Sequence, residues 1–300
     1  MYVITGASGN TGKVVAQRLL GHGEKVRVIG RDAKRLESLV QEGAEAFVAD
    51  MTDADSLAKA FSGAKAAYIM NPPNPANPDV RAFQERVNDA LVAAVKSSGV
   101  EYAVVLSSVG ADKPDKTGPV IGLRSLEQKL NDIASLKAVY LRAGYFMENL
   151  LPQAGIIRNF GMVGGPLRSD LKLPMIATED IGAAAADLLL RLDFGGKQAR
   201  ELLGQRDVTY QEVTNIIGQA IGRPGLRYMQ LGAAQLKPAL LGLGMSSNMA
   251  DLLLEMSDSL NSGYMAALEP RSTQNTTATS IETFVAKVFV PQFTGKAAGA

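Results

Sequence analysis

The sequence has 300 residues, a formal net charge of +1, 46% hydrophobic residues and 20% charged residues. A chain of this kind can fold as one large α/β domain or as a domain with a smaller lobe, and it is too apolar for disorder. Lysine and arginine never cluster without acidic residues among them, and cysteine is absent, so we expect no direct nucleic-acid binding, no disulfide and no metal site.

Short β-rich runs alternate with amphipathic helices along the first half of the chain. The strands are predicted at residues 2–5, 25–30, 45–50, 65–70 and 102–108, and the helices at 11–23, 32–43, 53–61 and 79–99. Near-continuous apolar strands separated by helices are typical of a parallel sheet that is covered on both faces. Right-handed crossovers then favour an α/β fold with a doubly wound, Rossmann-type sheet.

Three glycines with a spacing of three residues, Gly6, Gly9 and Gly12, separate the first strand from the first helix. The helix directs free N–H groups and the positive end of its dipole at this loop, which suits a pyrophosphate. We expect Gly6 to turn the chain, Gly9 to let the backbone approach the phosphates, and Gly12 to let the helix pack closely on the sheet. The alternative is a tight turn that binds nothing. Three short polar side chains of the loop can donate to phosphate oxygens, namely Ser8, Asn10 and Thr11.

Cationic residues follow the second strand, at the place where an NAD site usually has an acid and an NADP site an arginine. Arg31 comes directly after this strand, and Arg35 lies four residues further on. Both can meet a 2′-phosphate, whereas Asp32 is predicted to cap the following helix. The alternative is that the cations form a solvated surface. We therefore favour NADPH as the cofactor, with NAD(H) as the alternative.

The ends of the third and fourth strands complete the predicted binding cleft. Asp50 and Met51 are placed to cover the adenine, and Asn71 and Pro72 begin a proline-rich loop over the site. For Asn71, a structural role in the turn is an equally good interpretation. The single histidine, His22, lies at the C-terminal end of the first helix and is interpreted as a cap that favours the helix dipole.

The pattern changes after residue 145. Residues 149–170 are predicted to be rich in loops, Thr178 is the expected N-cap of a helix with Asp180 in its first turn, and residues 210–222, 233–244 and 247–260 indicate a mostly helical lobe. We therefore divide the chain into a Rossmann core, residues 1–150, with the helix 179–192 packed on it, and a smaller substrate or partner lobe, residues 151–300. The tail, residues 294–300, is expected to fray.

We expect no signal peptide before the first strand, and no apolar run approaches the ~18 residues of a membrane span. We expect a soluble, cytoplasmic protein without membrane contact. Helices exposed on the fold are compatible with a homo-oligomer.

Six segments, in register, resemble the NmrA-like family of atypical short-chain dehydrogenases between residues 1 and 230. They are TGASGNTG (5–12), IGRDAKR (29–35), AFVADM (46–51), LSSVGA (106–111), LRAGYFMENL (141–150) and TEDIGAAAADLLL (178–190). The resemblance implies an NAD(P)-binding Rossmann domain whose small C-terminal lobe closes over the nicotinamide. It also implies that relatives either reduce quinones, dyes or other conjugated molecules, or act as redox-sensing regulators.

The proton-donor pair Tyr-x-x-x-Lys of carbonyl-reducing short-chain dehydrogenases is missing, because none of the 8 tyrosines has a lysine four residues later. Where many relatives have the histidine of an L-H-x-x-E pattern, this chain has Arg124, followed by Glu127. Arginine is a poor general acid, but it can polarise a carbonyl or hold an anion. The alternative is a surface arginine that pairs with Glu127 or Glu148.

The resemblance assigns roles to residues at two further strand ends. Ser107 stands where related enzymes place a serine that binds substrate, and Gly144 and Tyr145 stand where the family contacts the nicotinamide. Tyr145 is our preferred residue for the wall of the substrate pocket, although no neighbour that would assist it as a proton donor can be identified. The candidate catalytic residues are therefore Tyr145, Arg124 and Ser107.

Two functional hypotheses follow. The first is an NADPH-dependent oxidoreductase that transfers a hydride to a quinone or a similar conjugated molecule, since such a transfer needs only a cofactor held in the correct geometry. The second is a non-catalytic sensor that binds NADP(H) and passes the signal to a protein partner. An isomerase or epimerase is disfavoured because these enzymes normally retain the tyrosine and the lysine.

Overall fold

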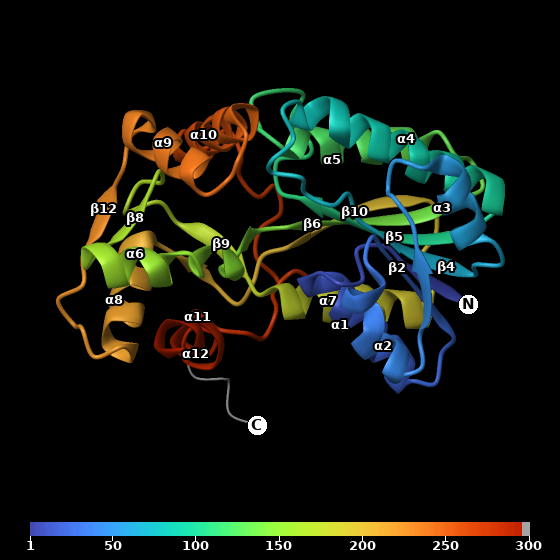
Figure 1. Ribbon diagram of the computed structural model, residues 1–300, viewed down its shortest axis with the longest axis horizontal. Helices are drawn as coiled ribbons and strands as arrows, with labels where there is room; N and C mark the ends of the chain where they lie inside the picture. Colours follow the sequence, from blue (N-terminus) through green and yellow to red (C-terminus); the bar gives the residue numbers. More distant parts are fainter. Residues whose placement is uncertain (296–300) are drawn as a thin grey trace.

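The computed structural model describes residues 1–295, and it consists of a sheet domain and a lobe that lie side by side (Figure 1). The tail was expected to fray, but from Lys296 on it lies outside the described part of the chain. No helix among residues 1–295 combines the length and the apolar character needed to cross a membrane. The lobe faces the ends of the strands of the sheet domain, so the space between the two parts is where a site is expected.

A seven-stranded sheet forms the centre of the first part, and every neighbouring pair of strands is parallel. The chain order reverses between β1 and β4, which makes the carboxyl ends of these two strands the expected ligand crevice. The predicted Rossmann-type sheet is therefore confirmed. From one edge to the other the strands are β10 (Lys197–Leu202), β6 (Lys137–Ala143), β5 (Tyr102–Ser108), β4 (Ala66–Ile69), β1 (Tyr2–Ile4), β2 (Val26–Gly30) and β3 (Glu45–Val48).

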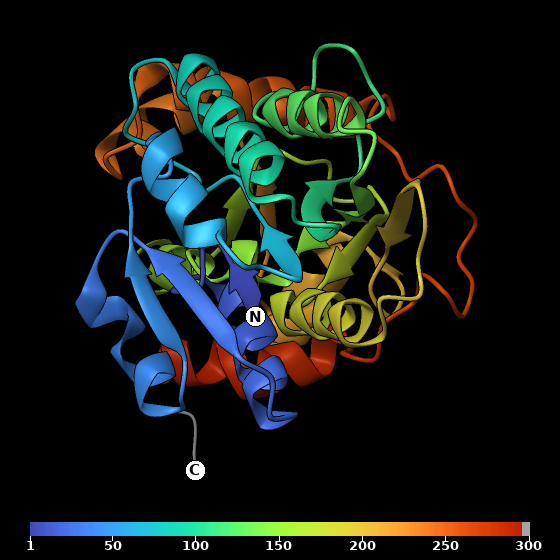
Figure 2. The ribbon, with the colours of Figure 1, turned by 90° about the vertical axis from the view of Figure 1, so that its right-hand side faces the viewer.

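Helices cover both faces of this sheet (Figure 2). Alternate strand residues point to opposite faces, so Ile4 belongs to one buried core and Val3 to the other. One face is covered by α1 (Asn10–Gly21), η1 (Ala33–Leu36), α2 (Glu37–Gln41) and α7 (Thr178–Arg191), and the other by α3 (Ala54–Phe61), α4 (Val80–Ser98) and α5 (Val120–Asn131).

The lobe combines helices with two small sheets, of which the sequence predicted only the helices. The sheets have the orders β11-β9-β7 and β12-β8. The stretch 149–170, predicted to be mostly loop, contains a complete helix and a strand. The elements are β7 (Tyr145–Phe146), η2 (Met147–Leu150), α6 (Gln153–Phe160), β8 (Val163–Gly165), β9 (Leu173–Ile176), β11 (Asp207–Val208), α8 (Tyr210–Ala220), β12 (Tyr228–Gln230), α9 (Ala233–Gly242), α10 (Ser247–Asn261), α11 (Ile281–Phe284), η3 (Val285–Phe289) and α12 (Val290–Thr294).

After the first elements of the lobe, the chain returns to the sheet domain with α7 and β10. α7 packs against α1, with Gly182 so close that a Cβ there would lie 2.6 Å from Cβ of Val14. β10 then joins the edge of the main sheet beside β6. Both elements therefore add to the sheet domain that the chain builds up to the end of β6 at Ala143, whereas β7 and η2, within the predicted core of residues 1–150, belong to the lobe.

Three predicted helix caps can be compared with the structure. The carboxylate of Asp32 accepts from the backbone N–H of Lys34 at 2.9 Å, and Nδ1 of His22 lies 2.8 Å from the carbonyl oxygen of Arg18, so both of these predictions are confirmed. The prediction of Thr178 as N-cap is wrong, because Ala177 holds that position. The reason is a distant partner, since the Glu148 carboxylate accepts from the N–H of Thr178 at 3.0 Å.

Candidate functional site

The loop after β1 needs two of its glycines for its own packing. Gly6 has a φ of +60°, and a Cβ there would lie 2.4 Å from Sδ of Met70. A Cβ on Gly12 would lie 2.5 Å from the carbonyl oxygen of Gly6. The close approach at Gly12 is therefore made to the loop and not, as we predicted, to the sheet. A side chain at Gly12 would need the backbone to move, and one at Gly6 would be strained by the left-handed φ and would have to displace the Met70 side chain.

Gly9 differs from these two glycines. It is the N-cap of α1 with a φ of −91°, which any residue can adopt, and a Cβ there would contact only the carbonyl oxygen of Gly6, at 3.2 Å. No side chain of residues 1–295 caps this helix. The first N–H groups of α1 and the positive end of its dipole thus remain available to an anion next to Gly9.

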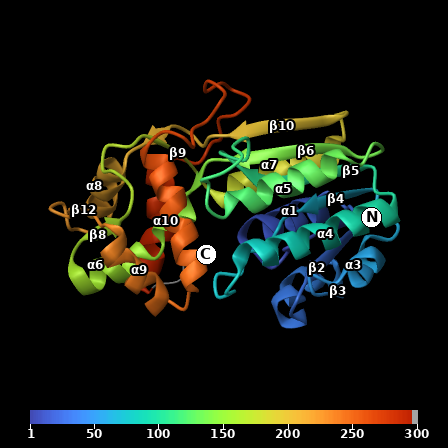
Figure 3. The same cartoon turned by 90° about the horizontal axis from the view of Figure 1, so that it is seen from above.

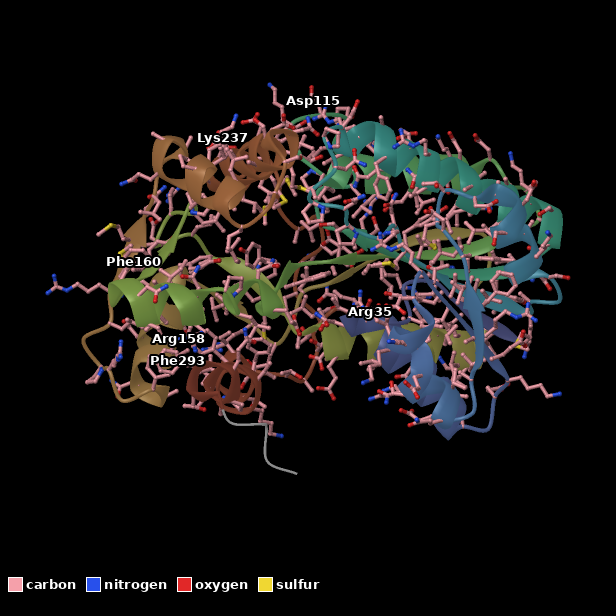
Figure 4. The ribbon with its side chains drawn as sticks, in the orientation of Figure 1. Arg35, Asp115, Arg158, Phe160, Lys237 and Phe293 are labelled. Carbon is pink, nitrogen blue, oxygen red and sulfur yellow. The ribbon has the colours of Figure 1, made fainter. Side chains whose placement is uncertain are left out.

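A cavity of about 540 Å³ lies against this loop, and we call it the glycine-loop cavity. Arg31 and Arg35 line it, and neither forms an ion pair with any residue of the described chain. Figure 4 labels Arg35 on the side of the sheet domain that faces the lobe. The predicted cofactor residues in its wall are Gly6, Ser8, Gly9, Arg31, Arg35, Met51 and Pro72.

Other predicted cofactor residues lie outside the wall of this cavity. Thr11 is buried, and its Oγ1 accepts from the Tyr68 hydroxyl at 2.9 Å. The Asp50 carboxylate accepts from N and Oγ1 of Thr52 at 2.8 and 2.7 Å, and these bonds, with the nearby charge of Arg31, lower the pKa of Asp50. Asn10 and Gly12 lie in the first turn of α1 outside the lining of this cavity.

Asn71 has a structural role in the fold. Its Nδ2 donates to the carbonyl oxygen of Gln84 at 3.1 Å and to Oδ1 of Asn88 at 2.8 Å, so it ties the end of β4 to α4. These contacts run to α4 and not within the turn, and the residue also lies in the wall of the next cavity, so both interpretations of Asn71 stay open.

Two further cavities continue from the glycine-loop cavity along the carboxyl edge of the sheet. The central cavity, of about 410 Å³, has Met70 and Pro73 in common with it and is also lined by Ser107 and Tyr145. The lobe cavity, also of about 410 Å³, meets the central cavity at Tyr145 and extends into the lobe. The predicted cofactor end and the predicted substrate end therefore form one series of spaces.

Tyr145 has a neighbour that its sequence surroundings do not reveal. Its hydroxyl lies 2.9 Å from the hydroxyl of Tyr210, at the start of α8, and the two rings meet edge to face with centroids 6.2 Å apart. Burial raises the pKa of Tyr145, so the phenol keeps its proton at neutral pH. Gly144 precedes it in the same wall, where a Cβ would lie 2.2 Å from the carbonyl oxygen of Pro174.

Ser107 is already engaged in a buried polar group. Its hydroxyl donates to Oε1 of Glu127 at 2.5 Å, and the same carboxylate binds Nε of Arg142 at 3.1 Å and its Nη2 at 2.6 Å. Glu127 is only 5% exposed. Ser107 lies in the wall of the central cavity with a hydroxyl whose orientation Glu127 fixes.

Arg124 does not reach these cavities. Its Nη1 donates to the carbonyl oxygens of Ala111 and Asp112 at 3.2 and 2.8 Å, and it is not part of the wall of any of the three cavities. The alternative pairing with Glu127 or Glu148 is wrong as well, because Arg142 occupies Glu127 and Thr178 occupies Glu148. The structure thus separates Arg124 from Tyr145 and Ser107.

The sequence model of the NmrA-like family matches residues 2–285. The chain belongs to this family. It is 27% identical over 270 residues to an NAD(P)H azoreductase from Xenophilus azovorans, and the match covers 89% of this chain and 90% of the relative.

Solved structures share the fold. An NADPH-dependent quinone oxidoreductase from Escherichia coli, in complex with NADPH, has a TM-score of 0.77 at 21% identity, covering 100% of this chain and 96% of the other. A triphenylmethane reductase from Citrobacter sp., in complex with NADP(H), has a TM-score of 0.80 at 18% identity, covering 95% and 99% of the two chains.

Sequence reasoning missed the residues that this NmrA-like chain brings to the site from its lobe. Tyr210 from α8 and the residues Met249, Leu253 and Met256 from α10 were assigned to helices but not to a site. Their apolar spacing predicts a buried helix face, and only the tertiary structure shows that this face covers a cavity.

Proposed function

We propose that this NmrA-like protein is an NADPH-dependent reductase of quinones or similar conjugated small molecules. The proposal is carried by one observation: the glycine-loop cavity joins the central cavity. The first has Arg31 and Arg35 in its wall, and the second is largely apolar beside Tyr145. The names of the azoreductase and of the quinone oxidoreductase that resemble this chain support the same reaction class.

The residues at the glycine-loop cavity fit a dinucleotide phosphate. Gly9 leaves the start of α1 open to the pyrophosphate, and Arg31 and Arg35 offer two guanidinium groups, without ion-pair partners among residues 1–295, to a 2′-phosphate. Met51 supplies an apolar surface for the adenine. We assign the cofactor NADPH to this cavity on these grounds.

NADPH supplies a hydride when it is bound. A quinone that accepts this hydride, with its two electrons, and one proton from water becomes a hydroquinone, so atoms and charge balance. The hydroxyl of Tyr210 can donate to that of Tyr145, which frees the proton of Tyr145 for an acceptor oxygen in the central cavity. Tyr145 would then orient the acceptor through a hydrogen bond without giving up its own proton.

The role of Tyr145 predicts a particular pH dependence. Because burial raises its pKa above the ordinary value of ~10, the phenol stays protonated between about pH 6 and pH 9. We expect Tyr145→Phe to lower kcat/KM about tenfold, and we expect this factor to be the same at every pH in this range. Tyr102→Phe is the control and should leave the rate unchanged, because Tyr102 begins β5 and the cavities lie at the other end of this strand, at Ser107 and Ser108. A Tyr145→Phe effect that disappears at high pH would contradict this role.

The cofactor preference can be measured separately from activity. Arg31→Ala should weaken NADPH binding about tenfold, since a charge-assisted contact to the 2′-phosphate is lost, and should change NADH binding less than about twofold. Lys34→Ala is a matched control, because Lys34 is a neighbouring exposed cation outside the cavity wall. Equal losses for both dinucleotides would contradict a 2′-phosphate contact at Arg31.

The reaction itself is tested by stopped-flow absorbance. NADPH bound to the protein is mixed with quinones, carbonyl compounds and dyes, and the reduced-nicotinamide signal is followed. We expect this signal to disappear with quinones, with one NADPH consumed per hydroquinone formed.

The second candidate function is a non-catalytic NADP(H) sensor. One observation favours it, namely that the hydroxyl of Ser107 is engaged by Glu127 and the guanidinium of Arg124 by backbone carbonyls. Tight NADPH binding without oxidation by any acceptor would support the sensor and contradict the reductase.

A further inference from the structure

The central cavity and the lobe cavity meet at a shared wall. Both are lined by Ser108, Gly144, Tyr145 and Met256. The first three follow one another at the carboxyl ends of β5 and β6 and the start of β7, so they form one continuous surface beneath both spaces. Met256 is the only shared residue that comes from α10.

One stripe of α10 lies over both cavities. Met249, Leu253, Met256 and Leu260 are spaced by four, three and four residues, which places them on the same side of a helix. Met249 and Leu253 line the central cavity, Leu260 lines the lobe cavity, and Met256 lines both. Met256 therefore stands at the position where one cavity passes into the other.

α10 lies on the side of the lobe that faces the sheet domain (Figure 3), and hydrogen bonds join its side chains to that domain. Oδ1 of Asn248 accepts from the N–H of Val80 at 2.9 Å, and Oε1 of Glu255 accepts from the N–H of Gly118 at 3.0 Å. A Cβ on Gly118 would lie 2.1 Å from the carbonyl oxygen of Leu252. Since the helix is fixed at these points, the side chain at position 256 decides how wide the passage between the cavities is.

The two cavities differ in chemistry. Beside Tyr145 the central cavity is mainly apolar, whereas the lobe cavity also has Lys172 and Glu269 in its wall, and neither forms an ion pair within residues 1–295. The first space suits the reducible ring of an acceptor, and the second can take a further ring, with polar substituents or without. The thioether of Met256, with three rotatable bonds, can adapt its shape to a molecule that lies between them.

We propose that Met256 determines the size of the acceptor, and that the preferred acceptors have two rings, one beside Tyr145 in the central cavity and the other in the lobe cavity. This inference rests on the proposed reductase function and specifies its substrate class. It concerns the passage at Met256 and not the wall with Arg31 and Arg35.

The test compares 1,4-benzoquinone with 2-phenyl-1,4-benzoquinone, which carry the same reducible ring without and with a second ring. The measured quantity is the ratio of kcat/KM for the two-ring to the one-ring quinone, with NADPH saturating. We expect Met256→Ala to raise this ratio about fivefold and Met256→Phe to lower it about tenfold, in line with the selectivity of apolar pockets. Leu260→Phe, which fills only the lobe cavity, should lower the ratio as well.

Met249→Ala is the matched control, because Met249 lines only the central cavity and its loss should affect both quinones alike. Each variant is first shown to bind NADPH and to melt as the wild type does. A ratio that stays within about twofold in both Met256 variants and in Leu260→Phe overturns this inference, while the reductase function stands if both quinones are reduced. If the wild-type protein reduces neither quinone, the proposed function fails and the inference fails with it.

Discussion

Replacing Gly9 by valine is expected to weaken NADPH binding at least about a hundredfold, a loss of ~2.7 kcal/mol, while the domain still folds. The backbone at Gly9 has a φ of −91°, so a β-branched residue meets no conformational barrier there. Its Cβ would contact only the carbonyl oxygen of Gly6, and the rest of the side chain would extend into the glycine-loop cavity. There it would cover the first N–H groups of α1, which the pyrophosphate needs.

The experiment measures two quantities, NADPH binding by calorimetry and the temperature of thermal unfolding. Substitutions at two other glycines serve as controls. Gly155→Ala in α6 has nothing within 4 Å of the new Cβ and should change neither quantity unfavourably. Gly12→Ala should lower the unfolding temperature, because its Cβ would lie 2.5 Å from the carbonyl oxygen of Gly6. If Gly9→Val binds NADPH within about tenfold of the wild type and melts unchanged, the phosphates do not lie at Gly9.

The features that the sequence predicted correctly are those carried by short segments. A strand, three spaced glycines and a helix form one local unit, and the arginines that follow β2 are held near it by the parallel pairing of β1 and β2. The alternation of strands and helices then leaves few topologies. For this reason a doubly wound parallel sheet could be predicted without a structure, and Gly9, Arg31 and Arg35, which were expected at one site, lie in the wall of one cavity.

The far end of the site could not be predicted because contacts between distant segments build it. Tyr145 and Tyr210 are separated by 65 residues in sequence, and the Glu148 carboxylate that caps α7 is separated by 30 from Thr178. Arg124 was assigned to the site through a resemblance, yet nearby carbonyl groups of the chain hold its guanidinium. Local pattern does not reveal which of several partners a polar side chain selects.

The buried group of Ser107, Glu127 and Arg142 leads to the second large prediction. Glu127→Gln should lower the free energy of unfolding by about 3 kcal/mol, as measured by urea denaturation. The amide keeps the size of the side chain, but it leaves the Arg142 guanidinium, with a side chain only 15% exposed, without a counter-charge. It also turns one of the two acceptor oxygens into an NH2 group, so either the Ser107 hydroxyl, now at 2.5 Å, or Nη2 of Arg142, now at 2.6 Å, loses its acceptor. Asp193→Asn, which breaks the exposed pair with Arg191, is the control and should cost less than about 0.5 kcal/mol.

A double variant separates the two causes of this loss. If the lone charge of Arg142 is responsible, Glu127→Leu with Arg142→Met should be more stable than Glu127→Leu alone by at least about 2 kcal/mol, because an apolar pair replaces an unbalanced ion. The double variant still leaves Ser107 without its partner, so the rotation of its hydroxyl in the wall of the central cavity becomes free. A rise in KM for the quinone that persists in the double variant would then report the positioning role of Glu127 separately from stability. A double variant no more stable than the single one would show that the lost hydrogen bonds, and not the remaining charge, account for the cost.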